Sequence, residues 1–334
     1  MTTVSLLGTA SHMPARVVDN DFFGLDVGSS RGAMFRGTRL RHHIADDETA
    51  VSMIERAAAR LGEQFGAETI RGVDLLLTNV SLPDQPFTGC GSSVSHVLGL
   101  RPRLVVDLHN AGCISFIYMM KVASALIRAG EGTSALLCNV QTLGGRVFSH
   151  PGNRSRPQSA VPGDGCGVGL VAASAASPIE AIAVRTFGEY ADDMRVFTDD
   201  GKPYWVPRLS PASIDFTEKR ITAVVARANR LVPEIVTEAC RAARLPLAAI
   251  DVLVTNQPNP ILLRNWREAL QVPKDAHVDT FEEHGNLFGA AIPIGITRAV
   301  DTGRLRPGNR LVLGGFSHAG DFAASAVVHW YPAV

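Results

Sequence analysis

An internal repeat constrains the fold of this 334-residue chain more than any other feature of its sequence. Residues 74–79 read DLLLTN and residues 251–256 read DVLVTN, and each segment follows a stretch with apolar residues at helical spacing. Farther along, RLVVDLHNAGC (103–113) has a counterpart in HVDTFEEHGN (277–286). Two matched segments in the same order, at nearly the same offset, predict that the chain contains two related halves.

The halves also match in the elements that come after these segments. In each half, a helix rich in small and apolar residues comes next, and a β-like run succeeds the helix. The predicted helices are ISFIYMMKVASALIRAG (114–130) and LFGAAIPIGITRAVDTG (287–303), and the β-like runs are TSALLCNVQ (133–141) and NRLVLGGFS (309–317). Short apolar strands that alternate with helices predict an α/β fold with mostly parallel pairing, in which two pseudo-symmetric halves stack as layers.

A polar, proline-bearing segment, EYADDMRVFTDDGKPYWVPRLSPASID (189–215), separates the two halves. We place the boundary inside 172–215, and we assign residues 1–175 to an N-terminal half and residues 176–334 to a C-terminal half. The polar segment is typical of a surface excursion. Both a lid over a binding site and a simple connector fit this pattern.

Charge and cysteine usage exclude several classes of function. Lys+Arg and Asp+Glu both number 32, which argues against a nucleic-acid partner and against polybasic membrane binding. No run reaches the roughly 18 apolar residues of a spanning helix, and the N-terminus lacks the basic region of a signal peptide. The five cysteines are scattered without zinc spacing, so we expect a reducing, cytoplasmic location and no metal site.

Cys113 follows Asn110, Ala111 and Gly112 at the start of a predicted helix. A thiolate there would lie near the positive end of the helix dipole and near free backbone N–H groups, which favour the nucleophilic form. The same N–H groups are placed to bind the oxyanion that forms when a thiol attacks a thioester carbonyl. Simple packing of a buried thiol is the alternative, and it fits the other four cysteines.

The second half brings further polar residues to the equivalent joints. His284 and Asn286 lie at the joint that corresponds to Cys113, and Asn256 lies at the end of the DVLVTN strand. Gly315 belongs to a flexible joint in the last β-like run of the repeat. In a pseudo-symmetric α/β molecule these loops converge at the carboxyl ends of the strands, where ligands generally bind.

Seven stretches together resemble one known family along essentially the whole chain. They are LLGTASHMPARVVDN, RLRHHIADDETA, DLHNAGCISF, VPGDGCGVGLV, NQPNPILLRNWREAL, EEHGNLFGAAIP and LGGFSHAG. The chain resembles thiolase-superfamily condensing enzymes of the ketoacyl-ACP synthase III type. The resemblance implies a thiolase-like duplicated fold, a homodimer and an acyl group carried as a thioester on the cysteine. It implies no permanently bound cofactor, because the acyl thioester of CoA or of an acyl carrier protein is the substrate.

The resemblance also assigns roles to individual residues. Cys113 matches the acylated nucleophile, Asn286 matches the asparagine of the HGN motif, and Gly315 matches the glycine whose N–H shares the oxyanion hole with Cys113. Asp164 and Gly165 match a structural GDG turn. Three residues fall in the region of the CoA or phosphopantetheine tunnel: Arg36, Arg156 and Asn259. Residues 81–99 match the region that in this family crosses to the partner subunit and caps the acyl pocket, which makes Phe87 and Cys90 candidate pocket residues.

One departure from the family pattern carries most of the functional prediction. Family members have a histidine at the start of an H-x-x-N segment, whereas this chain has Asn256 in the segment NQPN. That histidine, with the HGN asparagine, stabilises the enolate formed when a malonyl thioester loses carbon dioxide. Asn256 can donate a hydrogen bond, but an amide does not titrate near neutral pH. Loss of general acid–base catalysis typically lowers the rate of a reaction by roughly 10²–10⁴-fold.

A second departure concerns the donor. The tryptophan that the family stacks on the CoA adenine has no match near Gly32, so an acyl carrier protein fits as donor at least as well as CoA. Both departures resemble a natural-product subgroup that moves an acyl group to a hydroxyl, an amine or a second carrier. Such transfer needs a base for the small-molecule or carrier acceptor. His284 is the nearest candidate by motif, and His318 and His109 are the next histidines to consider.

Two alternatives to this acyltransferase remain open. The first is a ketosynthase that makes a carbon–carbon bond by decarboxylative condensation, with Asn256 as a hydrogen-bond donor only. The second is a catalytically silent subunit that pairs with an active homologue. A dinucleotide-dependent dehydrogenase is excluded, because no G-x-G-x-x-G motif follows an early strand with an acidic residue beyond it.

Overall fold

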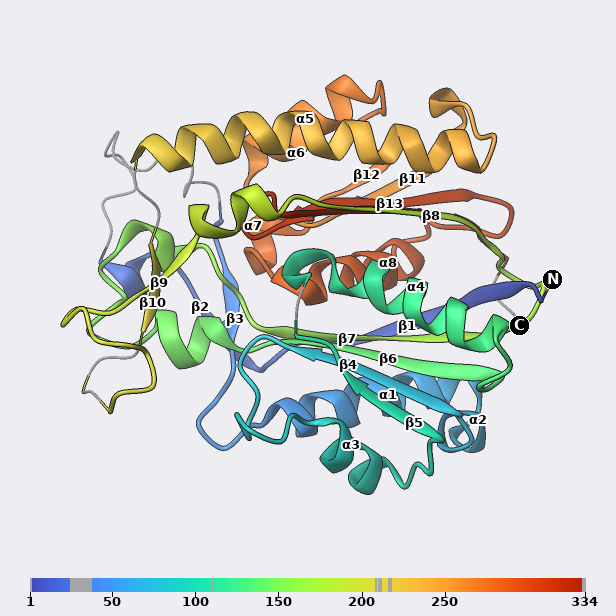
Figure 1. Ribbon diagram of the computed structural model, residues 1–334, viewed down its shortest axis with the longest axis horizontal. Coiled ribbons are helices and arrows are strands. Elements are labelled where there is room, and N and C mark those ends of the chain that lie inside the picture. Colours follow the sequence, from blue (N-terminus) through green and yellow to red (C-terminus); the bar gives the residue numbers. More distant parts are fainter. Residues whose placement is uncertain are drawn as a thin grey trace.

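The computed structural model describes residues 2–24, 38–109, 111–207, 209, 212–215 and 218–331. Figure 1 shows five layers, in which two β-sheets are separated by a central helical layer and covered on their outer faces by further helices. The central layer holds α4 (Ser115–Arg128) and α8 (Ala291–Asp301). One outer layer consists of α1 (Ala50–Phe65), α2 (Ala67–Arg71) and α3 (Gly91–Leu98). The other outer layer consists of α5 (Glu218–Ala242) and α6 (Pro260–Ala269).

The first sheet has the strand order β1-β7-β6-β4-β5. Its strands are β1 (Val4–His12), β4 (Leu75–Val80), β5 (Leu104–Asp107), β6 (Ser134–Gln141) and β7 (Gly165–Ala173). Strand β4 pairs in parallel with both β5 and β6, whereas β7 pairs antiparallel with β6 and β1. The parallel strands β4 and β5 end next to the loops that precede α3 and α4, so these loops lie at one edge of the sheet.

The second sheet repeats this arrangement in the order β12-β11-β13-β14-β8. Its strands are β8 (Ile179–Thr186), β11 (Val252–Thr255), β12 (His277–Val278), β13 (Arg310–Ser317) and β14 (Phe322–His329). Strand β11 is parallel to β12 and β13, and β14 is antiparallel to β13 and β8. The predicted repeat and its parallel pairs are therefore present, and each sheet also contains two antiparallel pairs. The proposed boundary after residue 175 lies between β7 and β8.

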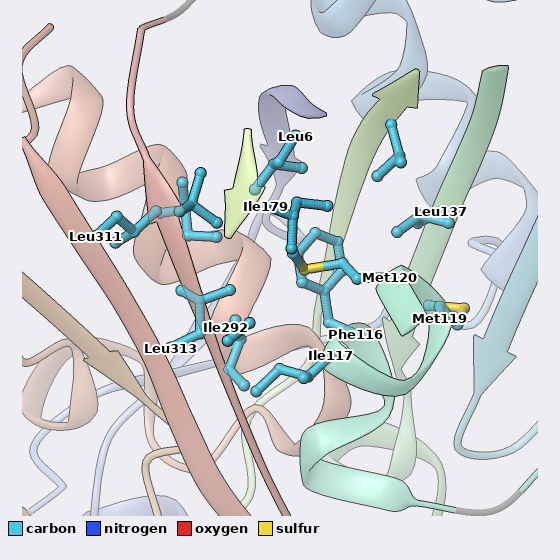
Figure 2. Close-up of a cluster of buried hydrophobic side chains, with 14 of the residues drawn as sticks. Leu6, Phe116, Ile117, Met119, Met120, Leu137, Ile179, Ile292, Leu311 and Leu313 are labelled. Atoms are coloured by element: carbon cyan, nitrogen blue, oxygen red, sulfur yellow. The ribbon is translucent and has the colours of Figure 1, made fainter. Parts of the chain in front are cut away.

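The main hydrophobic core fills the central layer between the sheets. Figure 2 shows Phe116 and Met120 of α4 among side chains from both sheets and from α8. A Cβ atom on Gly169 of β7 would lie 2.7 Å from the Phe116 ring, so the absence of a side chain at Gly169 lets this ring pack directly on the strand. Apolar residues surround α4 because it has a sheet on each side, which explains the continuous apolar run that predicted it.

The outer helices have one apolar face each, as their sequence spacing predicts. Helix α1 buries Met53, Ile54 and Leu61 against the first sheet. It begins with a capping box in which Thr49 accepts from the Ser52 backbone N–H and the Ser52 hydroxyl accepts from the Thr49 N–H. Such a cap satisfies donors that the first helical turn leaves without partners.

Shorter elements complete the fold. Two antiparallel pairs join β2 (Arg16–Val18) to β3 (Arg41–His43) and β9 (Arg195–Phe197) to β10 (Ser213–Asp215), and α7 spans Phe281–His284. The remaining short helical elements are Asp21–Phe23, Gly112–Ile114, Gly144–Phe148, Pro157–Ala160, Gly188–Asp193, Leu247–Ala249 and Phe288–Ala290. Within the described ranges, no helix is long and apolar enough to cross a membrane.

Candidate active site

Cys113 lies in the tight turn Gly112–Ile114 that leads directly into α4, at the helix start that the sequence predicts. The turn requires left-handed backbone at Ala111 (φ 65°) and at Gly112 (φ 34°). A Cβ atom on Gly112 would lie 2.5 Å from the Ser317 hydroxyl and 2.9 Å from Nε2 of His318. Glycine is therefore needed at 112 to let the β13–β14 turn approach the cysteine.

Burial controls the charge state of the Cys113 thiol, which is only 8% exposed. Desolvation raises the pKa of Cys113 to about 12. Hydrogen bonds from its own N–H, from the His318 N–H and from the Asn256 side chain stabilise the thiolate and act in the opposite direction, to lower this pKa. The Asp321 carboxylate raises the pKa of Cys113 further. The resting side chain is therefore a neutral thiol, and a base has to remove its proton during attack.

Asn256 directly follows β11, and its side chain is fixed by the backbone of Phe316. Its Nδ2 donates to the Phe316 carbonyl at 3.1 Å, and its Oδ1 accepts from the Phe316 N–H at 3.4 Å. This pair of bonds defines which end of the amide is nitrogen, and the second N–H of Nδ2 is the donor to the Cys113 sulfur. Asn256 is thus a fixed hydrogen-bond donor beside the thiol.

Asn286 is positioned by the loop that precedes β7. Its backbone N–H donates to the Val161 carbonyl at 2.8 Å, and its carbonyl accepts from the Gly163 N–H at 3.1 Å. The two loops approach closely at Gly163, where a Cβ atom would lie only 2.0 Å from the His284 carbonyl oxygen. The Asn286 Oδ1 accepts from the Phe288 N–H at 3.0 Å, so the amide nitrogen is the end that can donate to a ligand.

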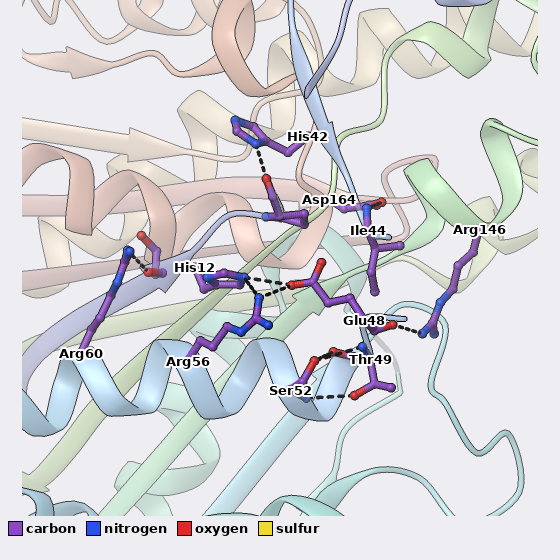
Figure 3. A network of polar contacts seen from close by, with 12 residues as sticks. His12, His42, Ile44, Glu48, Thr49, Ser52, Arg56, Arg60, Arg146 and Asp164 are labelled. Carbon is purple, nitrogen blue, oxygen red and sulfur yellow. Dashed lines mark hydrogen bonds and ion pairs between the residues drawn. The ribbon is translucent and has the colours of Figure 1, made fainter. Parts of the chain in front are cut away.

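Asp164 anchors the same loop from inside the protein. Its carboxylate accepts from the backbone N–H groups of Ile44, Gly144 and Gly145 at 2.9, 2.7 and 2.6 Å. Figure 3 shows Asp164 next to a second polar network, in which Glu48 contacts His12 and Arg56 at the start of α1. Burial raises the pKa of Asp164 to about 7, and the three N–H donors oppose that shift.

A cavity of about 140 Å³ brings these groups together. Its polar lining residues include Cys113, Asn256, Asn259, Asn286 and His318. The remaining lining is mostly apolar and includes Phe148, Val161, Pro162, Met194, Ile214, Val224, Val225, Pro258, Leu262, Phe288 and Phe316. Met194 and Ile214 belong to the excursion between the halves, so this excursion forms one wall. Among the described residues, no group of three or more His, Cys, Asp or Glu side chains is arranged to hold a metal ion.

Family models match both halves of this site. The model described as 3-oxoacyl-[acyl-carrier-protein (ACP)] synthase III matches residues 107–188, which include Cys113. The model of the C-terminal part of the same synthase matches residues 240–330, which include Asn256 and Asn286. Together these models cover just over half of the chain. The chain belongs to the ketoacyl-ACP synthase III family.

Individual relatives agree with this assignment over nearly the whole length. A β-ketoacyl-[acyl-carrier-protein] synthase III of Paramagnetospirillum magneticum is 29% identical, with 93% of this chain and 96% of the relative covered. The crystal structure of the synthase III of Pseudomonas aeruginosa has a TM-score of 0.83 at 26% identity and covers 99% of both chains. The priming β-ketosynthase of the R1128 polyketide pathway shares the fold, with a TM-score of 0.84 at 21% identity over 99% of this chain and 98% of the other. The protein is therefore an enzyme of the thiolase superfamily with the ketoacyl-ACP synthase III fold.

His284 does not line the cavity of this synthase III-family chain, although its motif made it the candidate base. Its ring packs against His42 with the ring centroids 5.3 Å apart. Desolvation lowers the pKa of His284 to about 4, and the neighbouring His42 lowers it further. Of the HGN motif, only Asn286 lines the cavity. The prediction that His284 acts as the base is therefore not supported by its position.

Gly315, the glycine predicted to share the oxyanion hole, lies within a strand of the second sheet. It is a residue of β13 that pairs with Ala324 of β14. A Cβ atom there would lie 2.4 Å from the Asn256 Oδ1 and 2.9 Å from Ile114. The backbone N–H groups that contact the sulfur are those of Cys113 and His318. Gly315 therefore makes room for Asn256, and its part in the oxyanion hole stays a prediction.

The residues predicted for the CoA or phosphopantetheine tunnel separate into three cases. Asn259 lines the cavity and caps α6, where its Oδ1 accepts from the Leu262 N–H at 2.9 Å. Arg156 pairs with Asp199 at 2.7 Å and stacks on the Phe197 ring, on the β9 side of the site. Arg36 lies outside the described residues.

The two predicted acyl-pocket residues do not line the cavity within one chain. Phe87 is 98% exposed on the surface. Cys90 is buried at the start of α3, where its thiol contacts Thr78 at 3.3 Å, and desolvation raises the pKa of Cys90 to about 12. Cys90 therefore packs inside its own chain, and a role for Phe87 requires a partner subunit.

Two residues near the cysteine were not predicted from the sequence. The Ser317 hydroxyl accepts from the Cys113 N–H at 3.1 Å, and Asp321 pairs with His318 at 3.1 Å. The sequence feature that points to these two residues is the run S-H-A-G-D (317–321), a polar turn between two otherwise apolar strands. Its relation to Cys113 depends on tertiary contacts, since more than 200 residues separate the two segments.

Proposed function

We propose that this synthase III-family chain is an acyltransferase that carries its acyl group as a thioester on Cys113. The donor is an acyl carrier protein or CoA thioester, and the acceptor is a hydroxyl, an amine or a second carrier in a biosynthetic pathway. The observation that carries this proposal is Asn256, a non-titrating amide in the place of the family histidine. Its two bonds to Phe316 fix it as a hydrogen-bond donor, so it assists an oxyanion but cannot exchange a proton.

The loading step is derived from the geometry around the thiol. The Cys113 sulfur attacks the donor carbonyl, and the carbonyl oxygen becomes an oxyanion as the new C–S bond forms. We propose that the N–H groups of Cys113 and His318, which contact the sulfur, bind this oxygen, and that it replaces the Ser317 hydroxyl as the acceptor for the Cys113 N–H. The C–S bond to the pantetheine then breaks, and the pantetheine thiolate leaves with a proton.

The cavity favours acyl groups over polar substrates on the enzyme side of the thioester. Its walls are mostly apolar, and residues of both halves and of the excursion line its volume of about 140 Å³. An apolar acyl chain gains free energy there by leaving water. We further propose that the protein works as a homodimer, in which the exposed Phe87 reaches the partner subunit.

Decarboxylative condensation is the second candidate function. It is favoured by the name of the Paramagnetospirillum relative, a β-ketoacyl-[acyl-carrier-protein] synthase III at 29% identity. Asn256 and Asn286 both line the cavity, so two amide donors are available for an enolate oxygen. The two functions differ in what discharges the acyl group from Cys113.

Intact-protein mass spectrometry distinguishes these functions. The protein is incubated with a panel of acyl-CoA and acyl-carrier thioesters and then with malonyl-carrier, with Cys113→Ala as the control that cannot load. We expect an acyl mass gain that survives malonyl-carrier and disappears with a hydroxyl, amine or thiol acceptor. Discharge by malonyl-carrier with release of carbon dioxide would establish the ketosynthase instead. No mass gain with any donor would favour the silent-subunit alternative.

An Asn256→His variant tests the observation that carries the proposal. A histidine can titrate where the asparagine cannot, so we expect malonyl decarboxylation by the variant to exceed that of the wild type, by up to roughly 10²-fold. Unchanged decarboxylation in a folded variant would show that Asn256 is not what limits condensation.

A further inference from the structure

The turn between β13 and β14 places a histidine–carboxylate pair beside the nucleophile. Nδ1 of His318 lies 3.1 Å from Oδ2 of Asp321. Asp321 is only 9% exposed, and its Oδ1 has no hydrogen-bond partner among the described atoms. A largely buried carboxylate bound to one ring nitrogen fixes the orientation of the imidazole and favours the tautomer with its proton on Nδ1.

The other ring nitrogen faces the loop that carries Cys113. A Cβ atom on Gly112 would lie 2.9 Å from Nε2 of His318, so this nitrogen lies directly over the residue before the nucleophile. His318 also lines the cavity that contains Cys113, Asn256 and Asn286. All ten histidines of the chain are described, and His318 is the one that lines this cavity.

The backbone of His318 is strained in a way that supports a functional role. Its φ is 49°, in the left-handed region that residues other than glycine seldom adopt. The turn is held by a bond from the Gly320 N–H to the Ser317 carbonyl at 2.8 Å and by Arg227, which donates to the Ala319 carbonyl. Strained non-glycine residues that the surrounding structure holds in place are concentrated at active sites.

We propose that His318, oriented by Asp321, is the general base of this enzyme. The inference rests on the proposed acyltransferase function, because a hydroxyl, amine or thiol acceptor must lose a proton as it attacks the thioester. Asn256 and Asn286 cannot accept that proton, and His284 does not line the cavity. His318 is the catalytic residue in this proposal, and Asp321 is a positioning residue.

The proton transfers balance over both half-reactions. During loading, Nε2 takes the proton of the Cys113 thiol as the sulfur attacks the donor carbonyl, and it returns the proton to the departing pantetheine thiolate. During transfer, Nε2 takes the proton of the acceptor as the acceptor attacks the acyl carbonyl. The C–S bond to Cys113 then breaks, and the cysteine thiolate recovers the proton from the imidazolium.

The test compares half-reactions in the His318→Asn variant. Asparagine tolerates the left-handed backbone and keeps a polar side chain, but it cannot act as a base. The S-acyl enzyme is formed with acetyl-CoA or butyryl-CoA and discharged with N-acetylcysteamine, which needs deprotonation, or with hydroxylamine, which attacks as a neutral amine. We expect loading and discharge to N-acetylcysteamine to slow by roughly 10²-fold or more, with hydroxylamine discharge nearly unchanged. His96→Asn, at an exposed position on α3, is the matched control.

Two further variants separate catalysis from structure. In His318→Gly, which relieves the backbone strain and removes the ring, added imidazole is expected to restore discharge to N-acetylcysteamine. Asp321→Asn is expected to slow this discharge, and Asp321→Glu is expected to recover part of the rate, since it restores a carboxylate. A purely structural role for the turn would give no rescue by imidazole.

Two outcomes overturn the proposal about His318. One is wild-type discharge to N-acetylcysteamine by a loaded His318→Asn enzyme, and the other is an imidazole-insensitive His318→Gly enzyme. Failure of the acyltransferase function is a separate result, because the wild-type S-acyl enzyme would then be discharged by malonyl-carrier alone. Even in that case, the loading rate of His318→Asn still tests whether His318 takes the Cys113 proton.

Discussion

Gly112 is the residue on which the approach of His318 and Ser317 to Cys113 most directly depends. A Gly112→Ala methyl group would overlap the Ser317 hydroxyl at 2.5 Å and Nε2 of His318 at 2.9 Å, so both side chains have to move. We expect acyl loading to slow by roughly 10²-fold, because catalytic groups lose their alignment. Mass spectrometry of the acyl enzyme over time measures this rate.

The matched control for that variant is Gly99→Ala. Gly99 has a similar left-handed backbone (φ 65°), but a Cβ atom there would have nothing within 4 Å. Both variants carry the same kind of backbone strain, on the order of 1 kcal/mol, and only Gly112→Ala crowds the site. Equal loading rates in the two variants would show that the contacts of Gly112 do not matter for the reaction.

The neutral state of the Cys113 thiol also has a measurable consequence. Because burial raises the pKa of Cys113 to about 12, the reactive thiolate is a small fraction at neutral pH and increases with pH. We expect the rate of alkylation by iodoacetamide to rise about tenfold per pH unit from neutral toward alkaline pH. Peptide mapping identifies the labelled residue, and Cys113→Ala corrects for the other cysteines. A plateau below pH 8 would contradict a neutral resting thiol.

At the scale of elements, the site depends on two loops that are joined through Asp164 and Asn286. The Asp164 carboxylate accepts three backbone N–H groups, from Ile44 just after β3 and from the Gly144–Phe148 turn, and its own loop bonds to Asn286. Asp164→Ala leaves three buried donors without an acceptor. We expect the free energy of unfolding to fall by about 3 kcal/mol or more, measured by chemical denaturation.

The exposed Asp46 supplies the control for this variant. Asp46→Ala removes the same carboxylate from a solvent-exposed position, and we expect it to change the free energy of unfolding by less than about 0.5 kcal/mol. Asp164→Asn keeps one acceptor oxygen and should lie between the two. A loss for Asp164→Ala as small as that for Asp46→Ala would show that the GDG turn does not anchor the loops.

Elements with strong periodicity are those that the sequence predicts best. The runs 133–141 and 309–317 form β6 and β13, and the segments 114–130 and 287–303 contain α4 and α8. Local sequence does not specify the side-chain direction of a short element. The four-residue helix α7 turns His284 toward His42, and only the packed loops reveal this.

At the scale of the whole molecule, the repeat predicts which loops converge but not every group that they bring together. Cys113, Asn256 and Asn286 were predicted from equivalent joints and line one cavity. The β13–β14 turn adds His318 to this cavity and Asp321 next to His318. The N–H of His318 contacts the Cys113 sulfur as well, and the sequence does not predict this contact, because it depends on how the turn folds over the cysteine.

The central layer makes the two halves depend on each other for stability. Helix α8 comes from the second half but packs on β1 and β7 of the first sheet, and α4 of the first half also contacts β14 and β8. Cutting the chain at the proposed boundary would therefore expose one apolar face on each fragment. Burial of this layer contributes roughly 25 cal/mol per Å² of apolar surface, which neither fragment recovers alone.

We therefore expect fragments 1–175 and 176–334 to be incompletely folded when they are produced separately. Each should bind a hydrophobic dye, show weak near-ultraviolet circular dichroism and unfold without a sharp transition, because its sheet loses the part of the central helical layer that the other fragment supplies. Mixing the fragments during refolding should restore the near-ultraviolet signal and the acyl loading of Cys113. The intact chain is the control, and we expect it to unfold in one cooperative step. Cooperative unfolding of either isolated fragment, without dye binding, would contradict this interdependence and would make the halves independent domains.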